Sequence, residues 1–185
     1  MSKKKNIVEN LFSAAVPSNI YTYYLDEPIG EQSHYRALSE LLMNAGEADT
    51  IRLMINSPGG YVSTAVQLSN LIQASKAHVE GHLIGPSASA ACTLFLSCHS
   101  WVVYPSVTLM AHTFRGGFYG KGEEAKDSFM STNELMEEMM LDLYYPFFSI
   151  DEIDDMLKNN RDIFLNAKQI TERLEVLEKH RYPEQ

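Results

Sequence analysis

The 185-residue sequence has no Asp, Glu, Lys or Arg between residues 81 and 114, where its charged fraction of 21% would place about seven. A gap of this length indicates either a membrane span or elements buried on every side. A span needs about 20 predominantly apolar residues in a row, and Pro86, Pro105, three histidines and a run of serine and alanine interrupt this stretch. We therefore interpret residues 81–114 as the buried core of a soluble protein, whose length suits one domain better than two.

Cysteine is scarce, and no secretory signal is recognisable. The two cysteines, Cys92 and Cys98, are too few for a disulfide framework. Both lie in the uncharged stretch, where we expect them to be small buried side chains in a reducing cytosol. The first residues are basic but contain no apolar stretch long enough for a secretory signal. These absences predict a cytoplasmic protein.

Basic patches are nearly absent as well. The net charge is −9, and residues 121–158 contribute eleven carboxylates against three lysines. Nucleic-acid binding normally leaves a basic surface, and the only basic cluster in the sequence is Lys3, Lys4 and Lys5. The composition therefore excludes nucleic acid from the expected partners.

The sequence does contain an alternation of strand and helix patterns. Ser149 with Glu152 and Asn166 with Gln169 form capping boxes, which mark the starts of two helices. Strands that alternate with helices predict an α/β domain with a largely parallel sheet. The expected strands are 19–28, 50–56, 79–84 and 101–112, the last broken near Pro105, and the expected helices are 32–45, 62–72, 87–98, a long acidic one from 122, 149–159 and 166–179.

Three motifs that suggest other chemistries fail on spacing or context. Residues 116–122 (GGFYGKG) resemble a phosphate-binding loop but are one residue short, and no Ser or Thr follows the lysine. His78 and His82 have the spacing of metal ligands on a helix, but their segment is an expected strand. Residues 85–89 (GPSAS) end in serine where a nucleophile elbow has glycine. We therefore expect no nucleotide, metal or other cofactor.

Ser89 lies in the first turn of the expected buried helix, where backbone N–H groups are unpaired. A serine hydroxyl becomes a nucleophile when a base removes its proton and donors stabilise the resulting oxyanion. The turn at residues 57–60 (SPGG) ends a neighbouring strand and allows close backbone approach. Ser89 and this turn can therefore supply a nucleophile and an oxyanion site. Small residues that only permit tight packing also explain this segment, and they are the commoner explanation for a Ser-Ala stretch in general.

Four segments in series resemble the Clp protease proteolytic subunit (ClpP) family of serine peptidases. They are residues 55–60 (INSPGG), 85–91 (GPSASAA), 110–117 (MAHTFRGG) and 161–167 (RDIFLNA). The similarity runs from about residue 20 to residue 167, in the same order and with similar gaps. It implies a crotonase-like (ClpP-type) α/β fold with a protruding handle helix at about 118–145. The peptidase domain would cover 19–180, after a mobile N-terminal segment at 1–18.

The resemblance implies a serine endopeptidase with a Ser-His-Asp triad. In that reading Ser89 is the nucleophile, His112 the general base, and Asp162 the carboxylate that orients the imidazole of His112. An acyl-enzyme forms on the serine and is then hydrolysed by water. The triad depends on geometry rather than chain order, so the order Ser-His-Asp in this sequence is acceptable.

The resemblance also assigns backbone groups. The N–H groups of Gly60 and Ala90 are implied to form the oxyanion hole, and an extended substrate is implied to add as a strand beside Val62 and Arg115. Two departures from the family pattern affect this region. Alanine replaces the family's methionine at position 90, and Thr-Phe replaces Gln-Pro after the histidine, which we expect to reshape the cleft.

Partners follow from the resemblance too. The acidic segment 121–145 corresponds to the family's handle, through which stacked rings, two heptamers, meet face to face. An AAA+ unfoldase (a Clp ATPase) would deliver polypeptide substrates to the chamber. The family's C-terminal ending is replaced here by residues 173–177 (RLEVL), and we expect this departure to affect docking of the ATPase more than catalysis.

Three other interpretations are compatible with the sequence. One is a catalytically silent ring subunit with a structural role only. Another is a signal-peptide or capsid-maturation peptidase of related fold, which usually pairs serine with lysine, although no lysine lies between Lys76 and Lys121. The third is an acyl-CoA hydratase or isomerase, which shares the oxyanion hole but typically uses carboxylates as acid and base.

Overall fold

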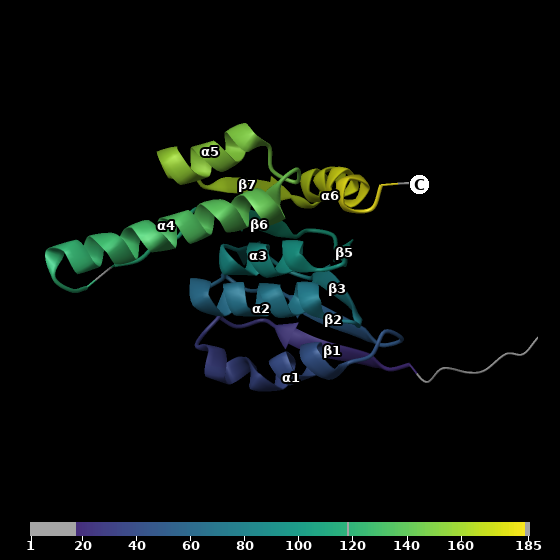
Figure 1. Ribbon diagram of the computed structural model, residues 1–185. Helices are drawn as coiled ribbons and strands as arrows, with labels where there is room; N and C mark the ends of the chain where they lie inside the picture. Colours follow the sequence, from purple (N-terminus) through teal and green to yellow (C-terminus); the bar gives the residue numbers. More distant parts are fainter. Residues whose placement is uncertain (1–17, 118, 184–185) are drawn as a thin grey trace, which may run out of the picture.

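A parallel four-stranded sheet in the order β1-β2-β3-β5 forms the larger layer of the computed structural model, which describes residues 18–117 and 119–183 (Figure 1). Apolar side chains occupy alternate positions along β2, so Ile51, Leu53 and Ile55 share one face of the strand and are fully buried. The other face of β2 carries Thr50, Arg52 and Met54, which are partly exposed. The strands are β1 (Ile20–Leu25), β2 (Thr50–Ile55), β3 (His78–Leu83) and β5 (Ser100–Val103).

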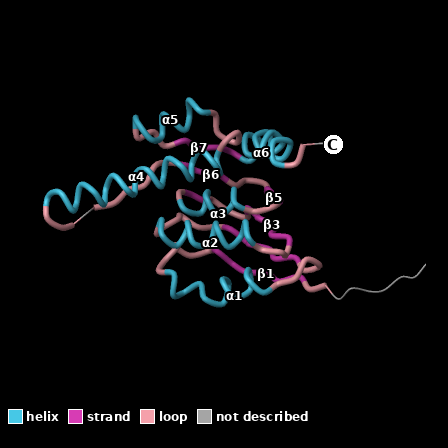
Figure 2. Tube along the Cα trace, in the orientation of Figure 1, coloured by secondary structure: helices cyan, strands magenta, loops and turns pink. Residues whose placement is uncertain are grey.

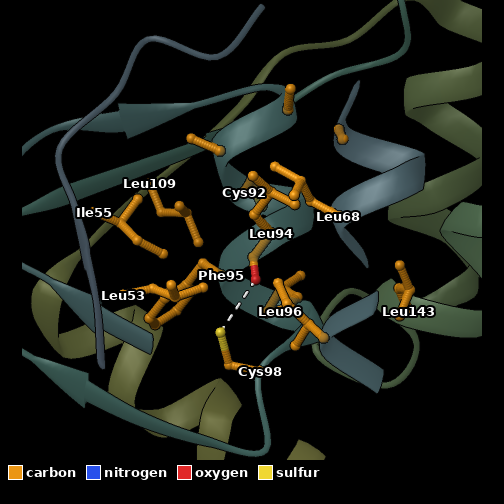
Figure 3. Close-up of a cluster of buried hydrophobic side chains, with 14 of the residues drawn as sticks. Leu53, Ile55, Leu68, Cys92, Leu94, Phe95, Leu96, Cys98, Leu109 and Leu143 are labelled. Atoms are coloured by element: carbon orange, nitrogen blue, oxygen red, sulfur yellow. Dashed lines mark hydrogen bonds between the residues drawn. The ribbon is translucent and has the colours of Figure 1, made fainter. Parts of the chain in front are cut away.

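Three helices lie side by side along the apolar face of this sheet (Figure 1). They are α1 (Arg36–Asn44), which follows the 3-10 turn η1 (Gln32–Tyr35), α2 (Val62–Ala74) and α3 (Ala90–Ser97). Every residue of α3 is buried. Figure 3 shows Phe95 and Leu94 of this helix among Leu53 of β2 and Leu68 of α2. Residues 81–114 therefore supply core, as their lack of charge predicts.

A smaller sheet in the order β4-β6-β7 lies beyond the β5 edge, at the end of the molecule farthest from β1 (Figure 2). Its strands are β4 (Ser87–Ala88), β6 (Thr108–Ala111) and β7 (Ile163–Asn166). β4 and β6 are parallel, whereas β6 and β7 are antiparallel. This sheet positions the candidate site.

The structure differs from expectation in three respects. The expected break near Pro105 is confirmed, at a turn that includes Ser106 with a φ of +63°, but the two parts of the expected strand 101–112 belong to different sheets. The expected helix 87–98 begins only at residue 90, after β4. β7 was not expected at all, since only four residues separate Asp162 from the next helix.

The C-terminal part adds three helices: α4 (Gly122–Tyr144), α5 (Ile150–Asn159) and α6 (Ala167–Arg181). Both expected capping boxes are confirmed, at Ser149 and at Asn166. α4 is the expected acidic helix, and its N-terminal end extends beyond the rest of the molecule (Figure 1). The segment expected to be mobile, 1–18, lies outside the described residues except for Ser18. Of the described helices, none combines the length and the apolarity that crossing a membrane requires.

Two arginines of α6 hydrogen-bond this helix to other elements of the domain. Arg173 donates two hydrogen bonds to the Glu152 carboxylate, at 2.7 and 2.8 Å, and one to the Phe147 carbonyl at 3.0 Å. Arg181 donates to the carbonyls of Leu96 at 2.8 Å and Leu143 at 3.3 Å, at the C-terminal ends of α3 and α4. The segment in which the sequence departs from the family pattern is therefore part of the packed domain.

Candidate active site

The smaller sheet brings Ser89, His112 and Asp162 to one edge. Ser89 directly follows β4, His112 directly follows β6, and Asp162 directly precedes β7. β6 and β7 run antiparallel with Ala111 opposite Ile163, so the next pair in register is His112 and Asp162. Two strand pairings thus assemble three residues that are up to 73 positions apart in the sequence.

Ser89 has an unusual backbone conformation. It is the N-cap residue of α3, not a residue of the first turn as expected, and its φ and ψ are 57° and −124°. A positive φ is unfavourable for a residue with a Cβ, and such strain persists where the surroundings enforce it, commonly at functional sites. Here the Ser89 N–H donates to the Met110 carbonyl of β6 at 2.8 Å, which fixes the turn against the strand that carries His112.

The turn at residues 57–60 is fastened to the segment that carries Ser89. Ser57 is fully buried, and its carbonyl accepts the Ala88 N–H at 3.0 Å while its N–H donates to Ser87 Oγ at 3.4 Å. Its hydroxyl donates to the Glu27 carbonyl at 2.7 Å and accepts the Gly59 N–H at 3.2 Å. Ser57 is therefore the centre of a network that holds both backbone turns.

Glycine is required at two positions of this turn. Gly59 has a φ of +88°, and a Cβ there would lie 2.5 Å from the Ala88 carbonyl oxygen and 2.8 Å from Ser89 Cβ. A Cβ on Gly60 would collide with the carbonyl of Ile29. The turn and the serine segment therefore touch through their backbones, as the glycine pair led us to expect.

The N–H groups of Gly60 and Ala90 are available as donors. Ile29 donates to the Gly59 carbonyl and accepts the Tyr61 N–H, both at 2.9 Å, so the N–H of Gly60 between them points away from Ile29. Ala90 is the first residue of α3, where helical N–H groups have no partner within the helix. Within the described residues, neither group donates a backbone hydrogen bond.

The imidazole of His112 and the carboxylate of Asp162 are close but not hydrogen-bonded. His112 Nδ1 lies 3.9 Å from Asp162 Oδ1, whereas Asp162 Oδ2 accepts a hydrogen bond from Arg115 Nη2 at 2.9 Å. Burial lowers the pKa of His112 below its ordinary value, Asp162 opposes this effect, and the Arg115 charge adds to it. His112 therefore stays neutral, and able to accept a proton, to a lower pH than free imidazole.

An apolar cavity adjoins Ser89 and His112. It lies between α2, α3 and α4, and it leaves about 20 Å³ of free volume, room for one water molecule. The flexible side chains of Met136 and Met139 must move to admit a larger group. Its lining comprises Val62, Ala65, Ser89, Ala90, Thr93, His112, Phe114, Met136, Met139 and Tyr144.

The predicted backbone positions also adjoin the site. Val62 begins α2 and lines the cavity, and Arg115 lies three residues after His112. Three contributions were missed from the sequence: the network around Ser57, the side chain of Arg115 on Asp162, and Tyr144 in the cavity wall. The first had a signal, since Ser57 belongs to the quoted SPGG motif. The other two depend on contacts between distant segments.

The two histidines considered as metal ligands lie on a strand, β3, as expected. His78 Nε2 is 2.7 Å from Ser100 Oγ, and His82 Nε2 is 3.1 Å from Glu80 Oε2. Across residues 18–117 and 119–183, no group of three or more His, Cys, Asp or Glu side chains is arranged to hold a metal ion.

The parallel sheet, the buried helix α3 and a serine fixed between two backbone turns define an α/β protein of the crotonase-like (ClpP-type) class. A sequence model of the Clp protease family matches residues 5–173, and the chain belongs to this family. This is a family of peptidases, and its members generally form rings and work with Clp ATPases.

Proposed function

We propose that this protein is a serine endopeptidase that degrades unfolded polypeptides inside a ring-shaped chamber. The observation that carries the proposal is the strand register that puts His112 opposite Asp162 and beside the strained Ser89. The presence of His112 rather than a lysine in the cavity favours a Ser-His-Asp site over the Ser-Lys pair of related-fold peptidases.

The proposed chemistry begins with His112 as general base. Nδ1 faces Asp162, so Nε2 takes the Ser89 hydroxyl proton as Oγ attacks the scissile carbonyl. The N–H groups of Gly60 and Ala90 stabilise the tetrahedral oxyanion. Protonated His112 then gives its proton to the leaving amine, and water hydrolyses the acyl-enzyme. The substrate lies as an extended strand beside Val62 and Arg115.

Assembly into stacked rings, two heptamers, forms the second part of the proposal. Exposed apolar side chains gathered on one projecting helix, α4, support it, because groups of exposed apolar side chains commonly mark protein–protein contacts. They are Phe129, Met130, Leu135 and Leu141. An AAA+ unfoldase (a Clp ATPase) would feed polypeptides into this chamber in the cytoplasm.

A serine-directed phosphonate combined with measurement of particle mass tests the proposal. We expect covalent labelling and cleavage of a short fluorogenic peptide by a large particle, and loss of both in Ser89→Ala. Ser33→Ala, which changes an exposed serine of η1, serves as the matched control and should retain both. A large particle that is never labelled would instead establish the silent ring subunit.

A further inference from the structure

Arg115 is the only basic side chain that contacts the candidate triad within the described residues, and it does so through Asp162. The two carboxylate oxygens are divided between partners: Oδ2 is 2.9 Å from Arg115 Nη2, and Oδ1 is 3.9 Å from His112 Nδ1. The first distance is a charge-assisted hydrogen bond, and the second is too long for one. Asp162 is thus bound to Arg115 and only adjacent to His112.

We propose that Arg115 is a positioning residue that restrains Asp162 and thereby limits the support that His112 receives during proton transfer. This inference rests on the proposed serine peptidase site. The Arg115 side chain is 75% exposed and Asp162 is 30% exposed, whereas His112 is 10% exposed. Arg115 therefore holds the carboxylate from the solvent side, and the carboxylate must shift toward the interior to hydrogen-bond Nδ1.

The electrostatics of the site act in the same direction. His112 becomes an imidazolium when it takes the Ser89 proton, and a nearby guanidinium opposes that charge. The groups that face His112 are Asp162 before β7, Arg115 after β6, and Tyr144 at the end of α4; α2 and α3 contribute no charge. Arg115 is the one cation in this set, and it also withdraws Asp162 from the developing charge.

Removing the charge at position 115 should therefore accelerate the reaction. In Arg115→Gln we expect kcat for a fluorogenic peptide to rise by at most about fivefold, because an exposed ion pair biases an equilibrium by no more than this. The acid limb of the pH profile should move to higher pH. Arg115→Lys should fall between Gln and the wild type. Lys168→Gln, an exposed residue of α6, makes the same charge change far from the site and should alter neither quantity.

Two further measurements make the proposal falsifiable. In Asp162→Asn the change at position 115 should lose most of its effect on kcat and keep only the direct repulsion between guanidinium and imidazolium; if the full effect persists, Arg115 does not act through Asp162. A rise in KM with unchanged kcat would show that the Arg115 side chain binds the substrate in addition to the backbone proposed above, and it would overturn the positioning role. An NMR titration of His112 is independent of activity: its pKa should rise in Arg115→Gln, and an unchanged pKa overturns the proposal. Failure of the phosphonate to label Ser89 would instead refute the proposed function.

Discussion

The hydroxyls of Thr93 and Tyr144 share a buried hydrogen bond of 2.9 Å, which joins the helix behind the candidate nucleophile to the end of the acidic helix α4. Both residues are almost inaccessible to solvent, and both line the cavity beside Ser89. The C-terminal end of α4 is therefore attached to the candidate site, so the position of this helix and the shape of the cavity depend on each other.

Thr93→Val should lower the free energy of unfolding by about 1–3 kcal/mol, because it leaves the buried Tyr144 hydroxyl without this partner. The double variant with Tyr144→Phe should cost less than the sum of the two single changes. Urea unfolding at fixed protein concentration measures both. Thr171→Val removes an exposed hydroxyl on α6 and should change stability by less than about 0.5 kcal/mol. Strict additivity would show that the two hydroxyls are not coupled.

Peptidase activity should be lost at a lower pH than the one at which a histidine of ordinary pKa becomes protonated. The base acts only when neutral, and protonation below its pKa abolishes it. Because burial and Arg115 lower the pKa of His112, kcat/KM should reach half its plateau at a pH below about 6.5. A half-point above this value would contradict the assignment of His112 as the base.

Asp162→Asn should change two features of the pH profile of kcat/KM, the position of its acid limb and the height of its plateau. Asp162 raises the pKa of His112, so its loss should move the acid limb to still lower pH. The plateau should fall by about 10⁴-fold, as it does when a triad loses the carboxylate that orients its histidine. Asp154→Asn, in an exposed pair on α5, is the matched control and should leave the profile unchanged. A full plateau in Asp162→Asn would exclude Asp162 from the triad.

Gly59→Ala should impair catalysis. The new Cβ would lie 2.8 Å from Ser89 Cβ, so the serine segment must move, and displacement of a reacting group by about 1 Å costs roughly 10²-fold in rate. Gly122→Ala places a methyl group where no atom lies within 4 Å, and it should retain full activity. Circular dichroism checks that both variants are folded. A folded Gly59→Ala with normal kcat would refute the close approach.

The ion pair between Glu152 and Arg173 predicts a pH-dependent stability. Hydrogen bonding to Arg173 lowers the pKa of Glu152, so its contribution is present above the ordinary glutamate pKa and is lost as the pH falls through the folded-state pKa. Glu152→Gln should cost about 1–3 kcal/mol at pH 7 and should lose less stability on acidification than the wild type. Lys158→Gln breaks an exposed pair and should behave as the wild type does. Parallel acid curves would contradict this role.

The sequence predicted most of the fold because its signals are local. Alternating apolar residues define β2, capping boxes define the starts of α5 and α6, and the missing charge identifies α3 as core. The break near Pro105 was predicted, but the pairing of β5 and β6 in different sheets was not, because an apolar pattern does not specify the partner strand. β7 escaped because four residues before a capping box give too weak a pattern.

The candidate site was predictable in its residues but not in its contacts. Ser89, His112 and Asp162 follow from short motifs at matching intervals. The hydrogen bond between Arg115 and Asp162 joins residues 47 positions apart, and it depends on the register of β6 against β7. The positive φ of Ser89 likewise results from tertiary hydrogen bonds, since nothing in its own residue type favours that conformation.

All three candidate catalytic residues adjoin the small sheet, while most of the apolar interior lies outside that sheet. The proposed chemistry therefore depends on a few strand pairings, whereas folding stability is spread over the whole interior. Substitutions among the buried residues of β1, β2 and β3 can change the thermal stability of the protein without disturbing the geometry around Ser89. Conversely, substitution of Ser89, His112 or Asp162 would remove the proposed chemistry and leave the buried residues of the large sheet unchanged. In this architecture the fold can persist after the activity has been lost.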